Sequence, residues 1–260
     1  MSRPKSNGRP ETEVGGLWQQ PALMNLLADL LIVAAVAALA WAALTALQRL
    51  PVFPLRQLVL QGAPVQVSVA QVEHAARSAI VGNFFTVDLE AARAAFEKLS
   101  WVRKATVRRQ WPDGLTLTLE EHEALAHWRQ ADGALALVNA QGEVFSAERP
   151  DDAPALPIFA GPEGSAAELL RRHGEFDAAL APIGRHVTSI ALSPRLAWRL
   201  RLDDGIAINL GREQERQPLG ERLGRFVAHY DNVKTRMATV RSVDMRYPNG
   251  FVLSGQDRKS

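Results

Sequence analysis

A run of apolar residues near the N-terminus, Leu26 to Leu47, constrains this chain more than any other feature. Only Asp29 and Thr45 are polar within it. An α-helix rises about 1.5 Å per residue, so the run would extend roughly 33 Å, enough to cross the hydrocarbon core of a bilayer. We therefore predict a transmembrane helix over residues 26–47. Asp29 is close enough to its start for the carboxylate to reach the lipid headgroups.

Two other interpretations of this run compete with a membrane anchor. Ala38-Leu39-Ala40 resembles the cleavage site of a signal peptide, but the apolar run continues past it and includes Trp41. The apolar part of a signal peptide is typically about 7 to 15 residues long. A buried helix of a soluble protein is disfavoured because the run has no polar face at any helical phase. We favour the anchor and keep the signal peptide as the alternative.

Basic residues around the run set its orientation, because they are enriched on the cytoplasmic side of membrane helices. Three precede the run and two follow it closely: Arg3, Lys5 and Arg9, then Arg49 and Arg56. The segment before the run has no apolar periodicity and is predicted to be a disordered cytoplasmic tail. The large C-terminal part is then expected outside the cytoplasm.

Composition narrows the classes of function. The chain has 30 Lys and Arg residues against 28 Asp and Glu residues, so its charge gives no case for nucleic acid as a partner. It has no cysteine, which excludes disulfides, thiolate metal sites and a cysteine nucleophile.

The pattern that follows the anchor predicts a small module of strand, helix, helix, strand, strand. Residues 55–61 alternate like a short strand. Ser68 and Gln71 fit a capping box that opens a helix over 69–80, with Val69, Val72, Ala76, Ala79 and Ile80 on one face. Asp88 is a suitable N-cap for a second helix that ends near Ser100, with Leu89, Ala92, Phe96 and Leu99 on one stripe. Two alternating strands flank Pro112-Asp113-Gly114 and form a hairpin.

Beyond Glu123 the pattern changes to short strands separated by turns, which predicts a mostly antiparallel sheet. The predicted strands are 135–139, 143–145, 198–202, 206–210 and 238–247. Two helices interrupt them. One opens with a capping box at Ser165 and buries Leu169, Leu170, Phe176 and Leu180; the other starts with Pro218 as its first residue and buries Leu219, Leu223, Phe226, Val227 and Tyr230.

No catalytic or metal-binding pattern is visible. His122 and His127 superficially resemble a zincin motif, but they are five residues apart instead of the four that place both on one helical face. No nucleophile motif or phosphate-binding glycine loop is present. We predict no catalytic residue, metal, cofactor or small-molecule substrate, with a membrane-anchored wall-modifying enzyme as the alternative.

The last predicted strand carries the sharpest functional hypothesis. Val243, Met245 and Tyr247 would face one way, and Pro248 then removes a backbone donor, which fits the edge of a sheet. An unpaired edge can accept a strand from a partner. A plain edge without a partner is the alternative.

Several motifs together carry a family resemblance. They are Asn83-Phe84-Phe85-Thr86-Val87-Asp88, Trp101-Val102-Arg103-Lys104-Ala105, Arg109-Gln110-Trp111-Pro112-Asp113-Gly114, Val138-Asn139-Ala140-Gln141-Gly142-Glu143-Val144-Phe145, Leu156-Pro157-Ile158-Phe159 and Val243-Asp244-Met245-Arg246-Tyr247. The chain thereby resembles the FtsQ/DivIB family of bacterial cell-division proteins, and its Gram-negative branch more closely. The resemblance covers everything from the anchor onward.

The resemblance implies an α+β fold with a POTRA module and a β module. Its divisions are a cytoplasmic tail (1–25), a transmembrane helix (26–47), a POTRA domain (48–123), a β domain (124–255) and a C-terminal tail (256–260). It implies a single-pass type II protein of the cell inner membrane, with the bulk in the periplasm at the division septum. POTRA modules also serve secretion, which is a further alternative. The chain, however, lacks the long run of amphipathic strands that such transporters carry.

The resemblance also implies partners and contact residues. It predicts a divisome scaffold that links early ring assembly to septal peptidoglycan synthesis by binding FtsB and FtsL, with FtsK, FtsW, FtsI and FtsN as further partners. The implied FtsB contacts are Tyr247, Asn249, Gly250 and, less directly, Arg195. Lys104, Val107 and Arg109 are the implied recruitment residues of the POTRA module. After Gly250 the sequence has no tryptophan where the family branch has one, and Phe251 is the aromatic residue nearby.

Overall fold

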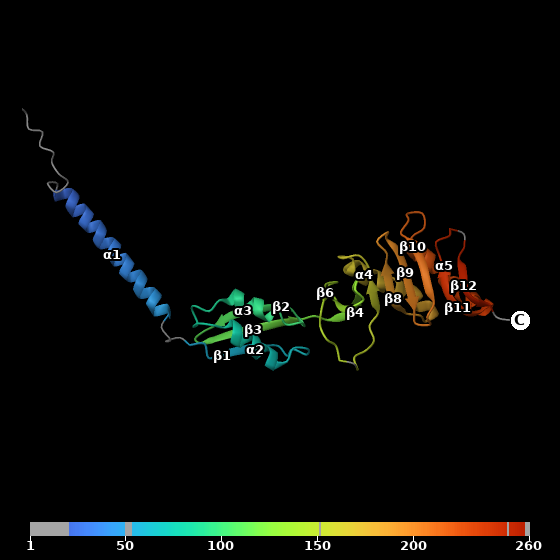
Figure 1. Ribbon diagram of the computed structural model, residues 1–260, viewed down its shortest axis with the longest axis horizontal. Coiled ribbons are helices and arrows are strands. Elements are labelled where there is room, and N and C mark those ends of the chain that lie inside the picture. The colour runs from blue at the N-terminus through green and yellow to red at the C-terminus, as the bar shows by residue number, and fades with distance from the viewer. Residues whose placement is uncertain (1–20, 50–53, 151, 249, 258–260) are drawn as a thin grey trace, which may run out of the picture.

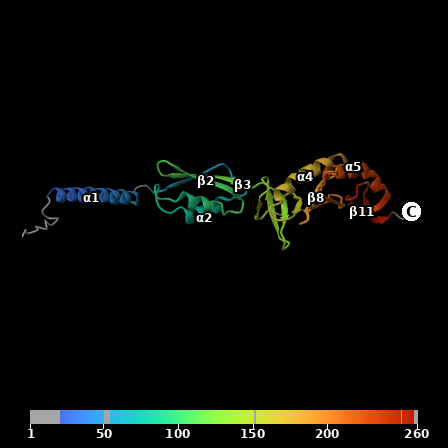
Figure 2. The same cartoon turned by 90° about the horizontal axis from the view of Figure 1, so that it is seen from above.

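The computed structural model describes residues 21–49, 54–150, 152–248 and 250–257 (Figure 1). An N-terminal helix is followed by a three-stranded sheet with two helices and then by a nine-stranded sheet with two long helices. Figures 1 and 2 show the first module between the N-terminal helix and the second module. The predicted α+β fold is confirmed.

The N-terminal helix α1 runs from Pro21 to Arg49, so it starts five residues earlier than the predicted span. A proline suits the first turn of a helix, because the amide hydrogen it lacks would have no intrahelical partner there. Its segment Met24–Ala46 is long and apolar enough to cross a membrane, and it is unburied. Apolar side chains that remain exposed along a whole helix fit contact with lipid. The rest of the predicted tail, residues 1–20, lies outside the described residues.

The first module has the predicted order of elements. They are β1 (Gln57–Gln61), α2 (Val69–Ala79), α3 (Leu89–Phe96), β2 (Val102–Gln110) and β3 (Gly114–Glu121). Strand β3 lies in the middle of the sheet, parallel to β1 and antiparallel to β2. The apolar face is buried as one cluster: Val67, Val72, Ala75, Ala92, Phe96, Val102, Ala105 and Leu117.

Local signals in this module are mostly confirmed. The Ser68–Gln71 capping box forms in full, and the Asp88 carboxylate accepts hydrogen bonds from the amides of Glu90 and Ala91. The second helix ends at Phe96, four residues before the predicted stop. The prediction that Val69 packs in the core was wrong, because this residue is 65% exposed. Val67, just before the helix, is buried in the module's core instead.

The second module is one sheet in the order β12-β11-β10-β9-β8-β7-β4-β5-β6. Its strands are β4 (Ala124–Arg129), β5 (Leu135–Asn139), β6 (Val144–Phe145), β7 (Ile158–Ala160), β8 (Val187–Leu192), β9 (Ala197–Leu202), β10 (Ala207–Arg212), β11 (Met237–Asp244) and β12 (Val252–Asp257). Of these, β4, β7, β8 and β12 were not predicted. Five neighbouring pairs are antiparallel and three are parallel.

Two helices explain two of the parallel pairs. Helix α4 (Ala166–Leu180) connects β7 to β8, and α5 (Leu219–Arg236) connects β10 to β11. Parallel neighbours need a crossover connection, and a helix packed on the sheet is the usual one. A short 3₁₀ helix, η2 (Ala181–Ile183), follows α4. The predicted buried faces of both helices are confirmed except that Leu170 and Val227 are only partly buried.

Both helix starts differ from prediction. Ser165 makes no side-chain cap; its hydroxyl donates to the carbonyl of Pro162 at 2.6 Å. Glu168 instead pairs with two arginines of the next turn. Pro218 stands just before the first helical residue, Leu219, instead of occupying the first position. Helix α4 thus begins where it was predicted but without its side-chain cap, and α5 begins one residue later than predicted; neither difference moves the buried faces.

An aromatic cluster joins the two modules. His122, between β3 and β4, stacks on Phe145 with ring centroids 4.0 Å apart and planes 10° apart. Trp101 meets the same ring edge-on at 5.5 Å, and its Nε1 donates to the carbonyl of Glu148 at 3.3 Å. We call Trp101, His122 and Phe145, with the polar residues that surround them, the junction cluster.

Polar contacts extend the junction cluster. Arg103 pairs with Glu120 of its own module at 2.6 Å and with Glu143 of the other at 3.1 Å. Asn139 Nδ2 donates to Glu143 Oε2 at 2.6 Å and lies 2.9 Å from His122 Nδ1. An amide N–H can only donate, so this last contact requires Nδ1 of His122 to be unprotonated.

Electrostatics at the junction favour that state. Burial lowers the pKa of His122; the carboxylates of Glu143 and Glu120 raise it, and Arg103 lowers it. The hydrogen bond from Asn139, followed by the contact with Arg103, lowers the pKa of Glu143. The neutral imidazole and the ionised carboxylate are therefore the forms that the folded junction holds.

The junction predicts a pH dependence of stability. The folded pKa of His122 lies below its unfolded value of 6.5, so the unfolded chain takes up the proton first as pH falls through that value. We expect the free energy of unfolding to fall between about pH 7 and pH 5.5. Glu143 adds a further loss at lower pH, below its ordinary value of 4.5. Denaturant titrations across this range measure the slope.

Two variants isolate the histidine. His122→Phe keeps an aromatic ring for the stack but cannot titrate, so it should reduce the slope between about pH 7 and pH 5.5, where His127, whose pKa is also lowered, accounts for a remainder. His74→Gln, at an exposed position of α2, is the matched control and should leave the slope unchanged. An identical slope in the His122→Phe variant would contradict the assignment.

Candidate functional site

The C-terminal margin of the second sheet is built by β12, not by β11. Strand β12 pairs antiparallel with β11, from Val252 opposite Asp244 to Asp257 opposite Met237. The prediction that the 238–247 strand is the open edge was therefore wrong, since the chain reverses direction and covers it. The segment Val252–Asp257 has only two apolar residues and a central glycine, and so carries little of the pattern that marks a strand.

Strand β12 is itself an edge. In the described sheet it has a neighbour on one side only, and an edge strand presents unpaired amide and carbonyl groups along its outer side. Val252 is exposed, Leu253 packs against the core, and Ser254 and Gly255 are exposed. These small side chains leave room for an incoming backbone. The opposite margin, β6, is only two residues long.

Aromatic packing secures the start of β12. Phe251 is half-buried and packs against the core of the second module. Its ring meets that of His229 on α5 edge-on, with centroids 6.0 Å apart. Phe251 therefore faces inward and fixes the strand, whereas a contact residue would face outward.

The turn between β11 and β12 contains the residues expected to contact a partner. Strand β11 ends at Asp244, so Tyr247 lies in this turn and its side chain is 51% exposed. Arg225 of α5 donates to the carbonyl of Pro248, and its Nη2 lies 3.5 Å from the carbonyl of Tyr247. Gly250 is half-buried, and Asn249 lies outside the described residues.

Arg195 lies in the turn between β8 and β9, and its side chain is exposed. The Ser193 hydroxyl accepts a hydrogen bond from the amide of Ala197 at 3.0 Å, which closes the turn. Ala197 is opposite Arg212, so this turn is at the end of the sheet where β10 finishes. Parallel pairing places the end of β11 there too. The turns that carry Arg195 and Tyr247 thus lie at one end of the sheet, with β10 between β9 and β11.

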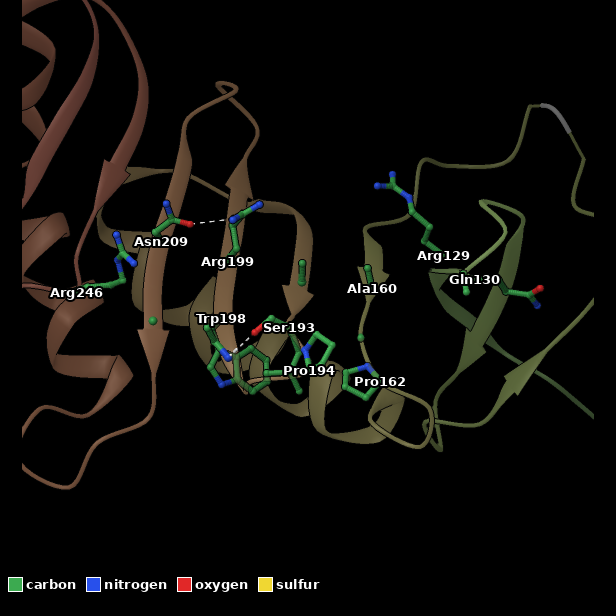
Figure 3. Close-up of a pocket in the computed structure, with 16 residues that line it drawn as sticks. Arg129, Gln130, Ala160, Pro162, Ser193, Pro194, Trp198, Arg199, Asn209 and Arg246 are labelled. Atoms are coloured by element: carbon green, nitrogen blue, oxygen red, sulfur yellow. Dashed lines mark hydrogen bonds between the residues drawn. The ribbon is translucent and has the colours of Figure 1, made fainter.

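An open cleft crosses the sheet beside this end (Figure 3). Its volume is about 590 Å³, and Arg246, Arg199 and Arg129 line it together with Trp198 and Pro194. A cleft that combines several guanidinium groups with apolar side chains suits an acidic peptide segment.

Two of these cations are held by neighbouring groups. Arg246 forms a two-point contact with the carboxylate of Asp244, which raises the pKa of Arg246 and lowers that of Asp244. Arg199 Nε donates to Asn209 Oδ1 at 2.9 Å. Gly211, at φ +77°, makes room for Arg246, because a Cβ there would lie 2.9 Å from Arg246 Cγ.

The three residues named for recruitment do not form one surface. Lys104 is exposed, whereas Val107 packs against the core under the helices. Arg109 donates from Nε to the carbonyl of Phe84 at 2.7 Å and from Nη2 to that of Val87 at 2.9 Å. Arg109 thus holds the loop between α2 and α3 in place, a structural role that the strand pattern alone did not reveal.

Metal-binding geometry is not found in the part of the chain that the structure describes, where no three His, Asp or Glu side chains gather. His122 lies in the connector between two strands and stacks on Phe145. His127 is in β4, where burial lowers its pKa and Arg149 lowers it further. The two histidines therefore lie in different environments.

Comparisons with known proteins match both modules. Residues 53–122 match the family described as POTRA domain, FtsQ-type. Residues 126–246 match the family described as Cell division protein FtsQ/DivIB, C-terminal. These two matches meet at the junction cluster, where β3 ends and β4 begins.

Curated relatives match nearly the whole chain. The cell division protein FtsQ of Burkholderia pseudomallei is 39% identical over 91% of this chain and 94% of its own length. That of Nitrosospira multiformis is 41% identical over 92% and 99%. That of Bordetella pertussis is 36% identical over 92% and 93%.

The contact between Arg225 and the β11–β12 turn can be tested directly. Arg225→Met keeps the aliphatic stem but removes the donors to the carbonyls of Tyr247 and Pro248. We expect local opening of the turn to become easier by roughly 1 kcal/mol, the order of one exposed hydrogen bond. Hydrogen exchange of peptides covering the turn should speed up while those of α4 stay unchanged. Arg216→Met, at an exposed loop position, is the control; equal exchange in both variants would contradict the contact.

Proposed function

This chain belongs to the FtsQ/DivIB family of cell division proteins, and from that premise we propose that it is a non-enzymatic scaffold of the divisome that binds FtsB and FtsL through the β12 margin. The observation that carries the proposal is the open side of β12 beside the exposed Tyr247 turn. An extended partner segment would add a tenth strand to the sheet. Recognition by strand addition combines backbone hydrogen bonds with side-chain pockets.

The energies of the expected contacts indicate which residues contribute most to binding. A net hydrogen bond contributes about 0.5–1.5 kcal/mol, and alternate backbone groups along the six-residue β12 would provide only a few of them. These backbone hydrogen bonds alone would give the complex modest affinity and no preference for the partner's sequence. Side chains at the end of the strand must supply the rest, and an exposed tyrosine is a typical hot-spot residue. We therefore assign the main specific contact to Tyr247, and keep Gly250 and Asn249, which lies outside the described residues, as further contacts.

The arginines near Tyr247 indicate that the partner segment carries acidic residues. Arg195 and the Arg246 cleft lie at the same end of the sheet as Tyr247. Acidic residues in the partner, next to its strand, would meet these cations, raise the rate of association and fix the register of the added strand. In this proposal the strand binds at β12 and the adjoining partner segment lies across the cleft.

The proposed topology places this margin in the periplasm. Arg3, Lys5 and Arg9 precede the anchor, so the N-terminus is cytoplasmic by the positive-inside rule. We propose a single-pass type II protein of the inner membrane at the division septum. There it would link early ring assembly to septal peptidoglycan synthesis.

We propose that the first module recruits other divisome proteins through one of the three residues named above. Lys104 is exposed and is retained as a contact with further divisome proteins such as FtsK, FtsW, FtsI or FtsN. Val107 packs under the helices, and Arg109, although exposed, is engaged with backbone carbonyls of a loop.

A charge placed at Tyr247 tests the site. Tyr247→Glu should lower the affinity for an FtsB periplasmic peptide by at least about tenfold, because truncated hot-spot aromatics typically cost 2 kcal/mol or more. Val144→Glu is the matched control, since Val144 is 44% exposed on β6, at the opposite margin of the same sheet. Calorimetric binding measures the affinity, and thermal unfolding checks the fold. Equal affinities in the two variants would refute the site.

Cross-linking tests the mode of binding. The chain has no native cysteine, so Ser254→Cys on β12 provides a single thiol for disulfide capture of FtsB peptides carrying one cysteine each. Strand addition predicts strong capture at every second peptide position, because side chains of a strand alternate between two faces. Capture every three to four positions would indicate a helix on the margin and would overturn strand addition. Capture of a second copy of this chain would show self-pairing of β12.

A further inference from the structure

One end of the first module exposes large apolar side chains outside its core. Trp111 in the β2–β3 turn is 82% exposed, Val81 after α2 is 73% exposed, and Phe85 in the next loop is 50% exposed. Phe84 packs edge-on against Phe85 with centroids 5.3 Å apart and is itself buried. We call Trp111, Phe85 and Val81 the apolar tip. An exposed tryptophan and an exposed phenylalanine at one end of a small module indicate a contact surface.

The apolar tip flanks the place where the chain arrives from the membrane anchor. The amide of Arg56 donates to the carbonyl of Asp113 in the Trp111 turn at 2.9 Å. Pro54 forms a β-bridge with Asn83, in the loop that carries Val81 and Phe85. Figures 1 and 2 show the first module with this end toward α1.

Chain length keeps the apolar tip close to the bilayer. The span ends at Ala46 and α1 continues to Arg49. Three helical steps of 1.5 Å and five extended steps of about 3.5 Å are the most that separate Pro54 from the span, so Pro54, which is bridged to Asn83 beside the tip, stays within roughly 22 Å of the hydrocarbon edge. The headgroup layer occupies the first 5–8 Å or so of that distance. The tether permits contact without any unfolding of the module.

Charge at this end favours a lipid surface. Arg56 is exposed beside the tip, and Arg108 is exposed near the end of β2. A shallow cleft of about 350 Å³, with Leu58 and Ile80 in its wall, opens between Arg56 and Arg77. Each basic residue near an anionic leaflet contributes about 1 kcal/mol of attraction. Apolar side chains with nearby guanidinium groups match the chemistry of anionic lipid headgroups above acyl chains.

We propose that the apolar tip, with Arg56 and Arg108, seats in the headgroup layer of the bilayer that anchors the chain. Tryptophan is enriched at this depth because its ring combines a large apolar surface with one hydrogen-bond donor. The module is then oriented as well as tethered. Strand β3 runs from this end toward the second module over roughly 27 Å, so the seat would hold the β12 margin at a fixed side and height above the membrane.

Site-directed spin labelling tests the seat on the full chain. With no native cysteine, Gln110→Cys beside Trp111 gives one nitroxide at the tip. Val65→Cys is the matched control, because Val65 is 85% exposed and its amide bonds Glu121 at the opposite end of the module. Both proteins are reconstituted in nanodiscs of phosphatidylethanolamine and phosphatidylglycerol. Power saturation with oxygen and with a water-soluble nickel chelate reports the depth of each label.

The proposal predicts a higher ratio of oxygen to nickel accessibility at position 110, at headgroup depth, and an aqueous ratio at position 65. Adding Trp111→Ser and Phe85→Ser should return position 110 to the aqueous ratio, with the same unfolding temperature as the parent. An aqueous ratio at both positions in the parent would overturn the seat. Shielding of position 110 that arises only when other membrane proteins are added would also overturn it and assign the tip to a protein partner.

Discussion

The pairing of β11 onto β10 is the contact on which the proposed binding margin, β12, depends. It is a short parallel ladder of three residue pairs, extended by the amide of Met245 donating to the carbonyl of Asn209 at 2.8 Å. Val243 and Met245 are fully buried in the module's core. Burial of one such side chain contributes about 1.5–3 kcal/mol, more than a net hydrogen bond of about 1 kcal/mol. Side-chain burial therefore holds β11, and β12 with it, on the sheet.

The sequence predicted features that depend on residues close together in the chain, and it failed for pairings between distant segments. The capping box at Ser68, the N-cap at Asp88 and the β2–β3 hairpin each depend on residues a few positions apart, and all three formed. The apolar run likewise gave the anchor helix. The strands that were missed, β4, β7, β8 and β12, are short or weakly patterned, and all of them except β12 have a parallel or sequence-distant neighbour. The pairing of β7 with β8 is decided by the crossover through α4, and that of β4 with β7 by a long connection through β5 and β6, and no local pattern specifies either of them.

The candidate site shows the same division. Tyr247 and Arg195 were named from resemblance to a family, and they are far apart in sequence; the register of β9, β10 and β11 brings their turns to one end of the sheet. The edge itself was assigned one strand too early, because Ser254 and Gly255 look like a loop. Arg109 has a structural contact that the strand pattern could not reveal: its side chain is exposed, and it also donates to backbone carbonyls of a distant loop.

The two margins of the nine-stranded sheet differ in how readily they can pair with a strand of another chain. An exposed strand edge invites pairing with any other edge, which is a route to aggregation. At β6 this risk is small, because the strand has two residues and the ring of Phe145 is covered by His122 and Trp101. At β12 the edge is longer and its neighbouring turn carries Tyr247, so a partner gains side-chain contacts that an unrelated strand would lack. The junction cluster thus does more than join two modules: it covers the Phe145 side chain at the short β6 margin, which leaves β12 as the margin for the strand addition that we propose.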